Sequence, residues 1–258
     1  MIILLSPAKT LDFENTASTD ESTKPHFHSQ ANRLAEEVGK CSIAELCKLM
    51  SVSENLGNQV HGFFSEWSNR YNVKRAKQAI YAFRGDVYRG FEVDTADEET
   101  IEFAQQHLRI LSGLYGLLRP LDLMQPYRLE MGTDLKGEHG KNLYEHWRDS
   151  IAKLIDETLD DHGNPLLINL ASQEYFTAAK AGTFDCELVT PVFKEFHKGK
   201  YKVMSFLAKV ARGSMARWIC EKRVDTVAGL RRFRKDGYEY NADMSSDTEL
   251  VFSREKRP

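Results

Sequence analysis

Two segments that directly follow predicted strands carry side chains that could perform catalysis. Ser6-Pro7-Ala8-Lys9-Thr10 follows a short apolar run at the start of the chain, and residues 169–175 follow a second apolar run at 166–170. Sites in α/β proteins gather at strand ends, so Ser6 could act as a nucleophile and Lys9 as an activating or phosphate-binding cation. One hypothesis is therefore an enzyme that acts on a nucleic acid or nucleotide. Its candidate catalytic residues are Ser6, Lys9, Asn169, Ser172 and Glu174.

A polar cleft would complete such a site. The side chains with suitable chemistry to line it are Arg84, Asp86, Tyr88, Arg128 and Glu130. Taken singly, each candidate is also typical of a turn, a helix cap or a salt bridge, and the sequence does not show that they converge. The chain has no Gly-x-x-x-x-Gly-Lys-Ser/Thr motif, so nucleoside-triphosphate hydrolysis has little support.

The sequence favours no metal site and no organic cofactor. The eight histidines are scattered, and only His26 and His28 are closely spaced, without a carboxylate or cysteine at supporting distance. The four cysteines form no CxxC pair, which argues against a disulfide framework and structural zinc. Cys220, near the basic Lys222 and Arg223, is the one thiol whose setting could make it reactive; a buried core cysteine is the alternative.

Basic residues are concentrated in two parts of a chain that is weakly acidic as a whole. The 258 residues include 35 Lys and Arg against 38 Asp and Glu, a formal charge of −3. Residues 194–235 nevertheless hold 13 basic side chains against three acidic ones, and residues 70–90 hold six against one. One interpretation is a solvated face, and the other is a surface that binds phosphate groups.

The pattern of apolar residues predicts a mixed α/β (α+β) fold in a single compact domain over residues 1–258. Strands are expected at the start and at 81–90, 166–170, 187–193, 201–206 and 250–252, and helices at 29–47 (two), 53–67, 73–79, 98–111, 142–159 and 207–220. Because strands separated by helices occur in every third of the chain, a central mixed sheet surrounded by helices fits better than a bundle. No stretch is long and apolar enough to span a membrane, and the first residues lack signal-peptide features, so a cytoplasmic location is expected.

A glycine turn follows the predicted helix at 98–111. Ser112-Gly113-Leu114-Tyr115-Gly116 has the form of a tight hairpin, and a second helix after it would give a helix-hairpin-helix-like segment over about 98–124. Glycines let a DNA backbone approach the peptide, and free N–H groups in the first turn of a helix can bind a phosphate oxygen. Such hairpins often hold a monovalent cation. The alternative is an ordinary helix end at glycine, and Pro120 would shorten any second helix.

Several long motifs resemble the bacterial YaaA peroxide-stress family over the whole chain. They are SPAKTLD at 6–12, FRGDVY at 83–88, QQHLRILSGLYGLLRPLD at 105–122, QPYRLEMG at 125–132, INLAS at 168–172, EYF at 174–176, PVF at 191–193 and ARG at 211–213. The resemblance implies a cytosolic protein, induced in hydrogen peroxide stress, that limits intracellular free iron and so protects DNA and proteins from Fenton damage. It also implies binding of duplex and branched DNA through a helix-hairpin-helix and a positively charged cleft, on an unusual fold.

The same resemblance implies a set of DNA-binding residues in this chain. The hairpin corresponds to Gly113, Leu114, Tyr115 and Gly116 with the basic flank Arg109 and Arg119, and the cleft cations would be Lys9, Arg84, Arg128, Lys209, Arg212 and Arg217. Family members carry paired lysines before the Ala-Arg-Gly motif, whereas this chain has Lys209 followed by Val210. We therefore expect about one phosphate contact fewer.

The leading interpretation is a DNA-binding protein of peroxide defence that contacts phosphates more than base edges. No helix with Arg, Asn or Gln at groove spacing stands out, so structure-selective or non-specific binding of duplex, bulged or junction DNA is expected. No membrane partner is expected, and the sequence leaves the oligomeric state open, with a monomer as the expectation. The enzyme described above and a direct iron-binding protein, whose ligands are not evident, are the alternatives.

Overall fold

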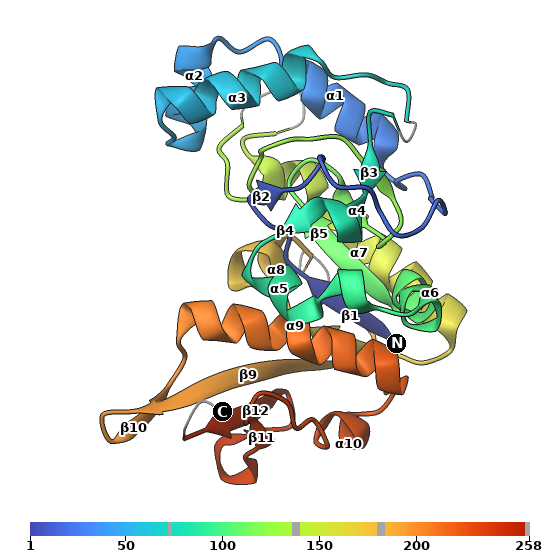
Figure 1. Cartoon of the computed structure of the whole chain (residues 1–258), viewed down its shortest axis with the longest axis vertical. Coiled ribbons are helices and arrows are strands. Elements are labelled where there is room, and N and C mark those ends of the chain that lie inside the picture. Colours follow the sequence, from blue (N-terminus) through green and yellow to red (C-terminus); the bar gives the residue numbers. More distant parts are fainter. Residues whose placement is uncertain (72–73, 136–139, 180–183, 256–258) are drawn as a thin grey trace.

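A central mixed sheet runs through the protein. The computed structural model describes residues 1–71, 74–135, 140–179 and 184–255 (Figure 1). Within these residues the sheet has eight strands, in the order β11-β12-β9-β8-β1-β5-β6 with β10 paired to β9. The inner strands run parallel to one another: β1 (Ile2–Leu5), β5 (Leu108–Ser112), β8 (Leu166–Asn169), β9 (Glu187–His197) and β12 (Glu249–Arg254). The outer strands are antiparallel to their neighbours: β6 (Gly116–Leu118), β10 (Lys200–Lys202) and β11 (Glu239–Tyr240).

Strand β1 lies in the middle of this sheet because it is apolar on both faces. All four of its residues are fully buried, and they pair with β5 on one side and with β8 on the other. Every residue of β5 and β8 is buried as well. Continuous buried runs are typical of parallel strands that helices cover on both faces. The predicted mixed α/β fold, with a central mixed sheet surrounded by helices, is confirmed.

The longer helices contact the central strands. They are α6 (Glu98–His107), α7 (Leu143–His162, kinked at Arg148) and α9 (Ser205–Lys222). Asp97 and Asn142 begin α6 and α7 by accepting hydrogen bonds from the backbone N–H groups of Thr100 and Glu145. Helices α1 (His28–Val38), α2 (Ile43–Met50) and α3 (Glu54–Ser65) gather at one end of the molecule, away from β9 and β12 (Figure 1).

Short elements connect these layers. The helices among them are α4 (Ala79–Ala82), α5 (Asp86–Phe91), α8 (Gln173–Ala179) and α10 (Val227–Leu230), with 3-10 turns at Val93–Thr95 and Ala242–Met244. Two small antiparallel sheets join β2 (Thr10–Leu11) to β4 (Phe83–Arg84) and β3 (Lys77–Gln78) to β7 (Leu123–Met124). The β2–β4 pair holds the segment after β1 against the segment that leads into α5.

Helices α5 and α9 cross in backbone contact at two glycines. A Cβ atom at Gly90 would lie 2.8 Å from the backbone nitrogen of Ser214, and one at Gly213 would lie 2.9 Å from the backbone nitrogen of Phe91. Both distances are too short for a real side chain, so only glycine allows this approach. The crossing fixes α9, and with it Lys209 and Arg212, against the start of α5.

Residues 98–124 do not form the predicted helix-hairpin-helix. Helix α6 ends at His107, and the glycine turn joins β5 to β6 in an antiparallel hairpin with Ser112 opposite Gly116. Leu114 and Tyr115 are fully buried, and Gly116 has φ +68° with the ring of Trp147 beside it. Residues 108–118 are apolar at most positions rather than on one helical face, so they form buried strands. A pair of helices joined by three residues does occur, at α2 and α3.

Three other predicted segments differ from the structure. The strand predicted at 201–206 ends at Lys202, because Ser205 already begins α9. The helix predicted at 73–79 is instead β3 and the first residue of α4, while Val73 itself lies outside the described residues. The strand predicted at 81–90 is limited to β4. Over the four described ranges, no helix has the length and apolar character needed to cross a bilayer.

Candidate functional site

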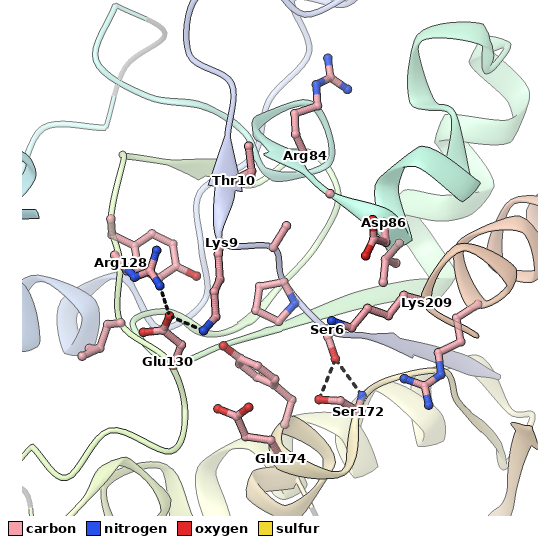
Figure 2. Close-up of a pocket in the computed structure, with 18 residues that line it drawn as sticks. Ser6, Lys9, Thr10, Arg84, Asp86, Arg128, Glu130, Ser172, Glu174 and Lys209 are labelled. Atoms are coloured by element: carbon pink, nitrogen blue, oxygen red, sulfur yellow. Dashed lines mark hydrogen bonds and ion pairs between the residues drawn. The ribbon is translucent and has the colours of Figure 1, made fainter. Parts of the chain in front are cut away.

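A pocket opens at the carboxyl ends of β1 and β8. Strand β1 pairs with β5 on one side and β8 on the other, and ligands of open α/β sheets bind where the strand order reverses in this way. The pocket has a volume of about 420 Å³. Its polar lining consists of Ser6, Lys9, Thr10, Arg84, Asp86, Tyr127, Arg128, Glu130, Ser172, Glu174, Tyr175, Lys209 and Arg212 (Figure 2).

Four of the five predicted catalytic residues line this pocket. Ser6 and Lys9 come from the segment after β1, and Ser172 and Glu174 from the segment after β8. The exception is Asn169, which is buried; its Oδ1 accepts a hydrogen bond from the backbone N–H of Ala171, and its Nδ2 donates to Thr190. Asn169 therefore shapes the end of β8 and does not reach the pocket.

Ser6 and Ser172 tie the two strand ends together. The backbone N–H of Ser172 donates to Oγ of Ser6 at 2.8 Å, and Ser6 Oγ donates to Ser172 Oγ at 3.3 Å. The hydroxyl of Tyr88 donates to the carbonyl oxygen of Ser6. Over the described residues, no carboxylate, histidine or lysine hydrogen-bonds to Ser6, so the structure holds no base in contact with this hydroxyl.

Glu130 joins two cations at one wall of the pocket. Its Oε1 lies 3.1 Å from Nζ of Lys9 and 3.1 Å from a terminal nitrogen of Arg128, without hydrogen-bond geometry to either (Figure 2). Nε of Arg128 is buried and has no hydrogen-bond partner among the described residues. This donor is enclosed by the protein, so a bound molecule would reach it only after the Arg128 side chain moved.

Arg84 is neutralised by two carboxylates outside the pocket. Its guanidinium donates to Asp12 and lies 3.2 Å from Oδ1 of Asp94. Burial acts to raise the pKa of Asp12, but hydrogen bonds from Asn15 and the charges of Lys77 and Arg84 outweigh it and hold that pKa well below its usual range. Arg84 is therefore a weaker anion receptor than its charge alone suggests.

Lys209 and Arg212 have no counterion in the part of the chain that the structure describes. Neither has a hydrogen bond or an ion pair with any described residue, although both line the pocket. In Figure 2 the side chain of Lys209 extends from α9 toward Ser6. Burial lowers the pKa of Arg212, and no carboxylate acts against that shift. Of the five cations that line the pocket, these two have no charge partner within residues 1–71, 74–135, 140–179 and 184–255.

Two buried tyrosines form the wall between these groups. Tyr127 and Tyr175 line the pocket, and burial raises the pKa of both hydroxyls. Tyr127 shares a 2.7 Å hydrogen bond with Ser112. Neither tyrosine is among the site residues predicted from the sequence, where the one signal for them is that they neighbour Arg128 and Glu174 in the chain.

Comparison with known proteins identifies the family. Residues 1–244 match the family model described as "Peroxide stress protein YaaA". The chain belongs to this family. A "UPF0246 protein" of Shewanella oneidensis is 48% identical over 255 residues, 99% of both chains, and another of Shewanella sediminis is 48% identical over 257 residues, 100% of both. Membership of the YaaA family confirms the resemblance seen in the sequence and supports a role in peroxide stress.

The structure divides the DNA contacts implied by the family resemblance into two groups. Five of the six cleft cations line the pocket: Lys9, Arg84, Arg128, Lys209 and Arg212. The sixth, Arg217, is buried and donates to the carbonyl oxygens of Phe91, Glu92 and Thr95. Arg217 thus holds α9 to the segment after α5, and its guanidinium is not presented to a ligand.

The hairpin residues also have structural roles in this member of the YaaA family. Arg109 is buried and donates to the carbonyl oxygens of Gln105 and Leu108, and burial lowers its pKa to about 10. Arg119 pairs with Asp122 at 2.9 Å and donates to the carbonyl oxygen of Lys24. Gly113 to Gly116 are buried, so this turn presents little surface to a DNA phosphate. Strands β5 and β6 flank the turn in place of the two expected helices, and DNA contact by these residues stays a prediction.

Metal-ligating and thiol groups are dispersed. No group of three or more His, Cys, Asp or Glu side chains positioned for a metal ion occurs within residues 1–71, 74–135, 140–179 and 184–255. Cys220 is fully buried, and burial raises the pKa of its thiol to about 12. A thiol in this setting is inert, so the core interpretation of Cys220 is the better one.

Proposed function

We propose that this member of the YaaA family binds DNA by phosphate contacts centred on the pocket, as part of peroxide defence. The observation that carries the proposal is that five cations from four separate segments, between Lys9 and Arg212, line one pocket. Two of them, Lys209 and Arg212, have no counterion among the described residues, so their charge is available to an anion. Cations that converge without neutralisation are what a phosphate-binding surface requires.

Recognition of this kind reads the backbone rather than the bases. The pocket offers ammonium and guanidinium donors, and contacts of these groups to phosphate carry no sequence information. Binding should therefore depend on DNA structure and on salt. Each neutralised phosphate contributes a slope of about −0.9 to a plot of log affinity against log salt concentration.

The test is binding of labelled duplex, bulged and junction DNA at several salt concentrations. The variant Lys209→Glu/Arg212→Glu should bind at least about tenfold more weakly, with a salt slope smaller by about two. The matched control is Arg223→Glu/Arg234→Glu, which makes the same charge change in exposed side chains paired with Glu99 and Glu239, away from the pocket. An intact protein that fails to bind DNA at low salt, or a control variant as weak as the pocket variant, would overturn the proposal.

An enzyme that acts on a nucleic acid or nucleotide is the second candidate. The observation that favours it is that the carboxylates of Asp86 and Glu174 line the same pocket as Ser6 and Lys9. Loss of protection from peroxide in cells carrying Lys9→Ala, with DNA affinity unchanged in vitro, would favour this candidate over DNA binding alone.

Limitation of free iron is a separate part of the proposal, and its support is family membership alone. Electron paramagnetic resonance of chelatable iron in intact cells, with and without the protein, tests it. Metal analysis of the protein purified without chelators then distinguishes direct iron binding from an indirect effect.

A further inference from the structure

We propose that the pocket holds a single nucleotide by its terminal phosphate, a phosphomonoester, in preference to the internal phosphodiesters of a DNA strand. The nucleotide is either free or the end of a bound strand. The strand-end form rests on the proposed DNA-binding function, whereas the free form does not.

The size of the pocket limits what can enter it. A volume of about 420 Å³ is in the lower part of the range for small-molecule sites, roughly 300–1,000 Å³. A duplex, whose major groove alone is about 12 Å wide, can only lie across the mouth of such a pocket. A single nucleotide is a ligand of the small-molecule class that sites of this size take.

The uncompensated charge matches a phosphomonoester. Lys209 and Arg212 together carry two positive charges without a counterion in the described part of the chain. A phosphomonoester carries about −1.5 to −2 at pH 7, whereas an internal phosphodiester carries one negative charge. A dianion therefore neutralises both cations, and a diester leaves one of them unpaired.

The arrangement of polar groups gives the phosphate a defined place. Arg212 is half-buried on α9, one residue before the glycine at which this helix crosses α5. Lys209 points toward Ser6, whose hydroxyl lies beside that of Ser172 (Figure 2). Burial lowers the pKa of Arg212, so an anion bound beside it would favour its charged form. The phosphate is thus expected between α9 and the two serines.

The rest of the nucleotide would contact the opposite wall. Nε of Arg128 is a buried donor without a partner, and Glu130 fixes this side chain in position. Tyr127 and Tyr175 also line this pocket, but with 6% and 9% of their surface exposed they offer a base little area for stacking. We therefore expect weak discrimination among bases and strong dependence on the phosphate.

The first arm of the test uses free nucleotides. Isothermal titration calorimetry compares dAMP with deoxyadenosine, which lacks the phosphate, and with inorganic phosphate. We expect dAMP to bind, deoxyadenosine to bind at least about tenfold more weakly, and Arg212→Gln to reduce dAMP affinity by about 10- to 100-fold, the usual range for a charged hydrogen bond. Arg223→Gln, in an exposed ion pair elsewhere on the chain, is the control and should change affinity less than about twofold. Lys209→Gln, at an exposed position, tests the same site without disturbing buried groups.

The second arm uses nicked and recessed-end duplexes of one sequence that carry either a terminal phosphate or a hydroxyl. A preference of about tenfold for the phosphorylated end, abolished by Arg212→Gln, is expected. Equal affinity for both ends together with no binding of dAMP would overturn the inference. If the inference fails in this way but salt-dependent DNA binding persists, the proposed DNA-binding function stands without the terminal-phosphate site. If dAMP binds and no DNA does, the inference holds for a free nucleotide and the proposed DNA function fails.

Discussion

Replacement of Gly213 by alanine tests whether close backbone contact with α5 holds α9 in place. Gly213 lies at the crossing of α5 and α9, and an added Cβ would be 2.8 Å from the carbonyl carbon of Val87 and 2.9 Å from the backbone nitrogen of Phe91. Ordinary van der Waals contact begins at about 3.4 Å, so the two helices must move apart. The obstacle is backbone rather than the end of a flexible side chain, which leaves no rotamer that relieves it.

The magnitude follows from two opposed effects. Overpacking costs about 1–3 kcal/mol, and contact with rigid backbone places this substitution at the upper end. Replacement of glycine by alanine inside a helix returns about 0.5–1 kcal/mol. We expect the free energy of unfolding to fall by about 2 kcal/mol, which corresponds to a decrease of about 4–8 °C in Tm for a chain of this length.

The matched control is Gly62→Ala. Gly62 lies within α3, and a Cβ there would meet nothing within 4 Å, so only the gain in helix propensity remains. This control should be more stable than the original protein by about 0.5–1 kcal/mol. Thermal and urea unfolding of both variants give the comparison. If Gly213→Ala is as stable as Gly62→Ala, the helices are not held by this contact, and the position assigned to Lys209 and Arg212 loses its support.

Three further predictions concern buried polar groups. Burial lowers the pKa of His107 and His162 from 6.5, so the unfolded chain binds more protons than the folded protein as the pH falls through this value. The urea midpoint of unfolding should therefore decrease between pH 7.5 and pH 5. The decrease should be smaller in the variant His107→Gln/His162→Gln. A pH-independent midpoint would contradict this. Arg217→Met leaves three carbonyl oxygens without their donor and should lower the free energy of unfolding by about 2–4 kcal/mol. The folded fraction of this variant should bind DNA as the original protein does. Weakened DNA binding at full stability would instead indicate that Arg217 contacts DNA. Cys220 should resist iodoacetamide in the folded protein and react only after denaturation, because burial raises the pKa of its thiol to about 12. Mass spectrometry measures the labelling, and rapid labelling of Cys220 in the folded protein would contradict the prediction.

The sheet was predictable where burial makes every position apolar. The run from Ile2 to Leu5 and the run at 166–170 have no polar face, which is the pattern of a parallel strand covered on both sides. The same physics explains the error at 98–111. Ile101, Ala104, Leu108 and Leu111 match helical spacing, but Leu108 to Ser112 is also buried at every position, and the two patterns overlap at the boundary. The pairing of β5 with β1, which lies about 100 residues earlier in the chain, decides between them.

The kinds of side chain in the candidate site could be predicted from the sequence, but not all of the individual residues that line the pocket. Strand ends identified Ser6 and Glu174, because the order of elements places such residues at one edge of a sheet. A positive charge alone does not distinguish Arg212, which faces the pocket without a partner, from Arg217, which binds three carbonyl oxygens five residues later. That difference depends on which side of α9 meets α5, and the glycine crossing that sets it joins segments more than 100 residues apart.

The position of β1 has a consequence for how the chain is made. This strand precedes both of its neighbours in the sheet, because β5 begins at Leu108 and β8 at Leu166. At a synthesis rate of about 5–20 residues per second, roughly 5–20 s separate β1 from β5 and roughly 8–30 s separate it from β8. During this interval four apolar residues have no strand to pair with, and such segments aggregate readily. The centre of the finished sheet is therefore a part of the chain that is made early and paired late, and a ribosome stalled before residue 108 would release a fragment in which β1 has neither of its neighbouring strands.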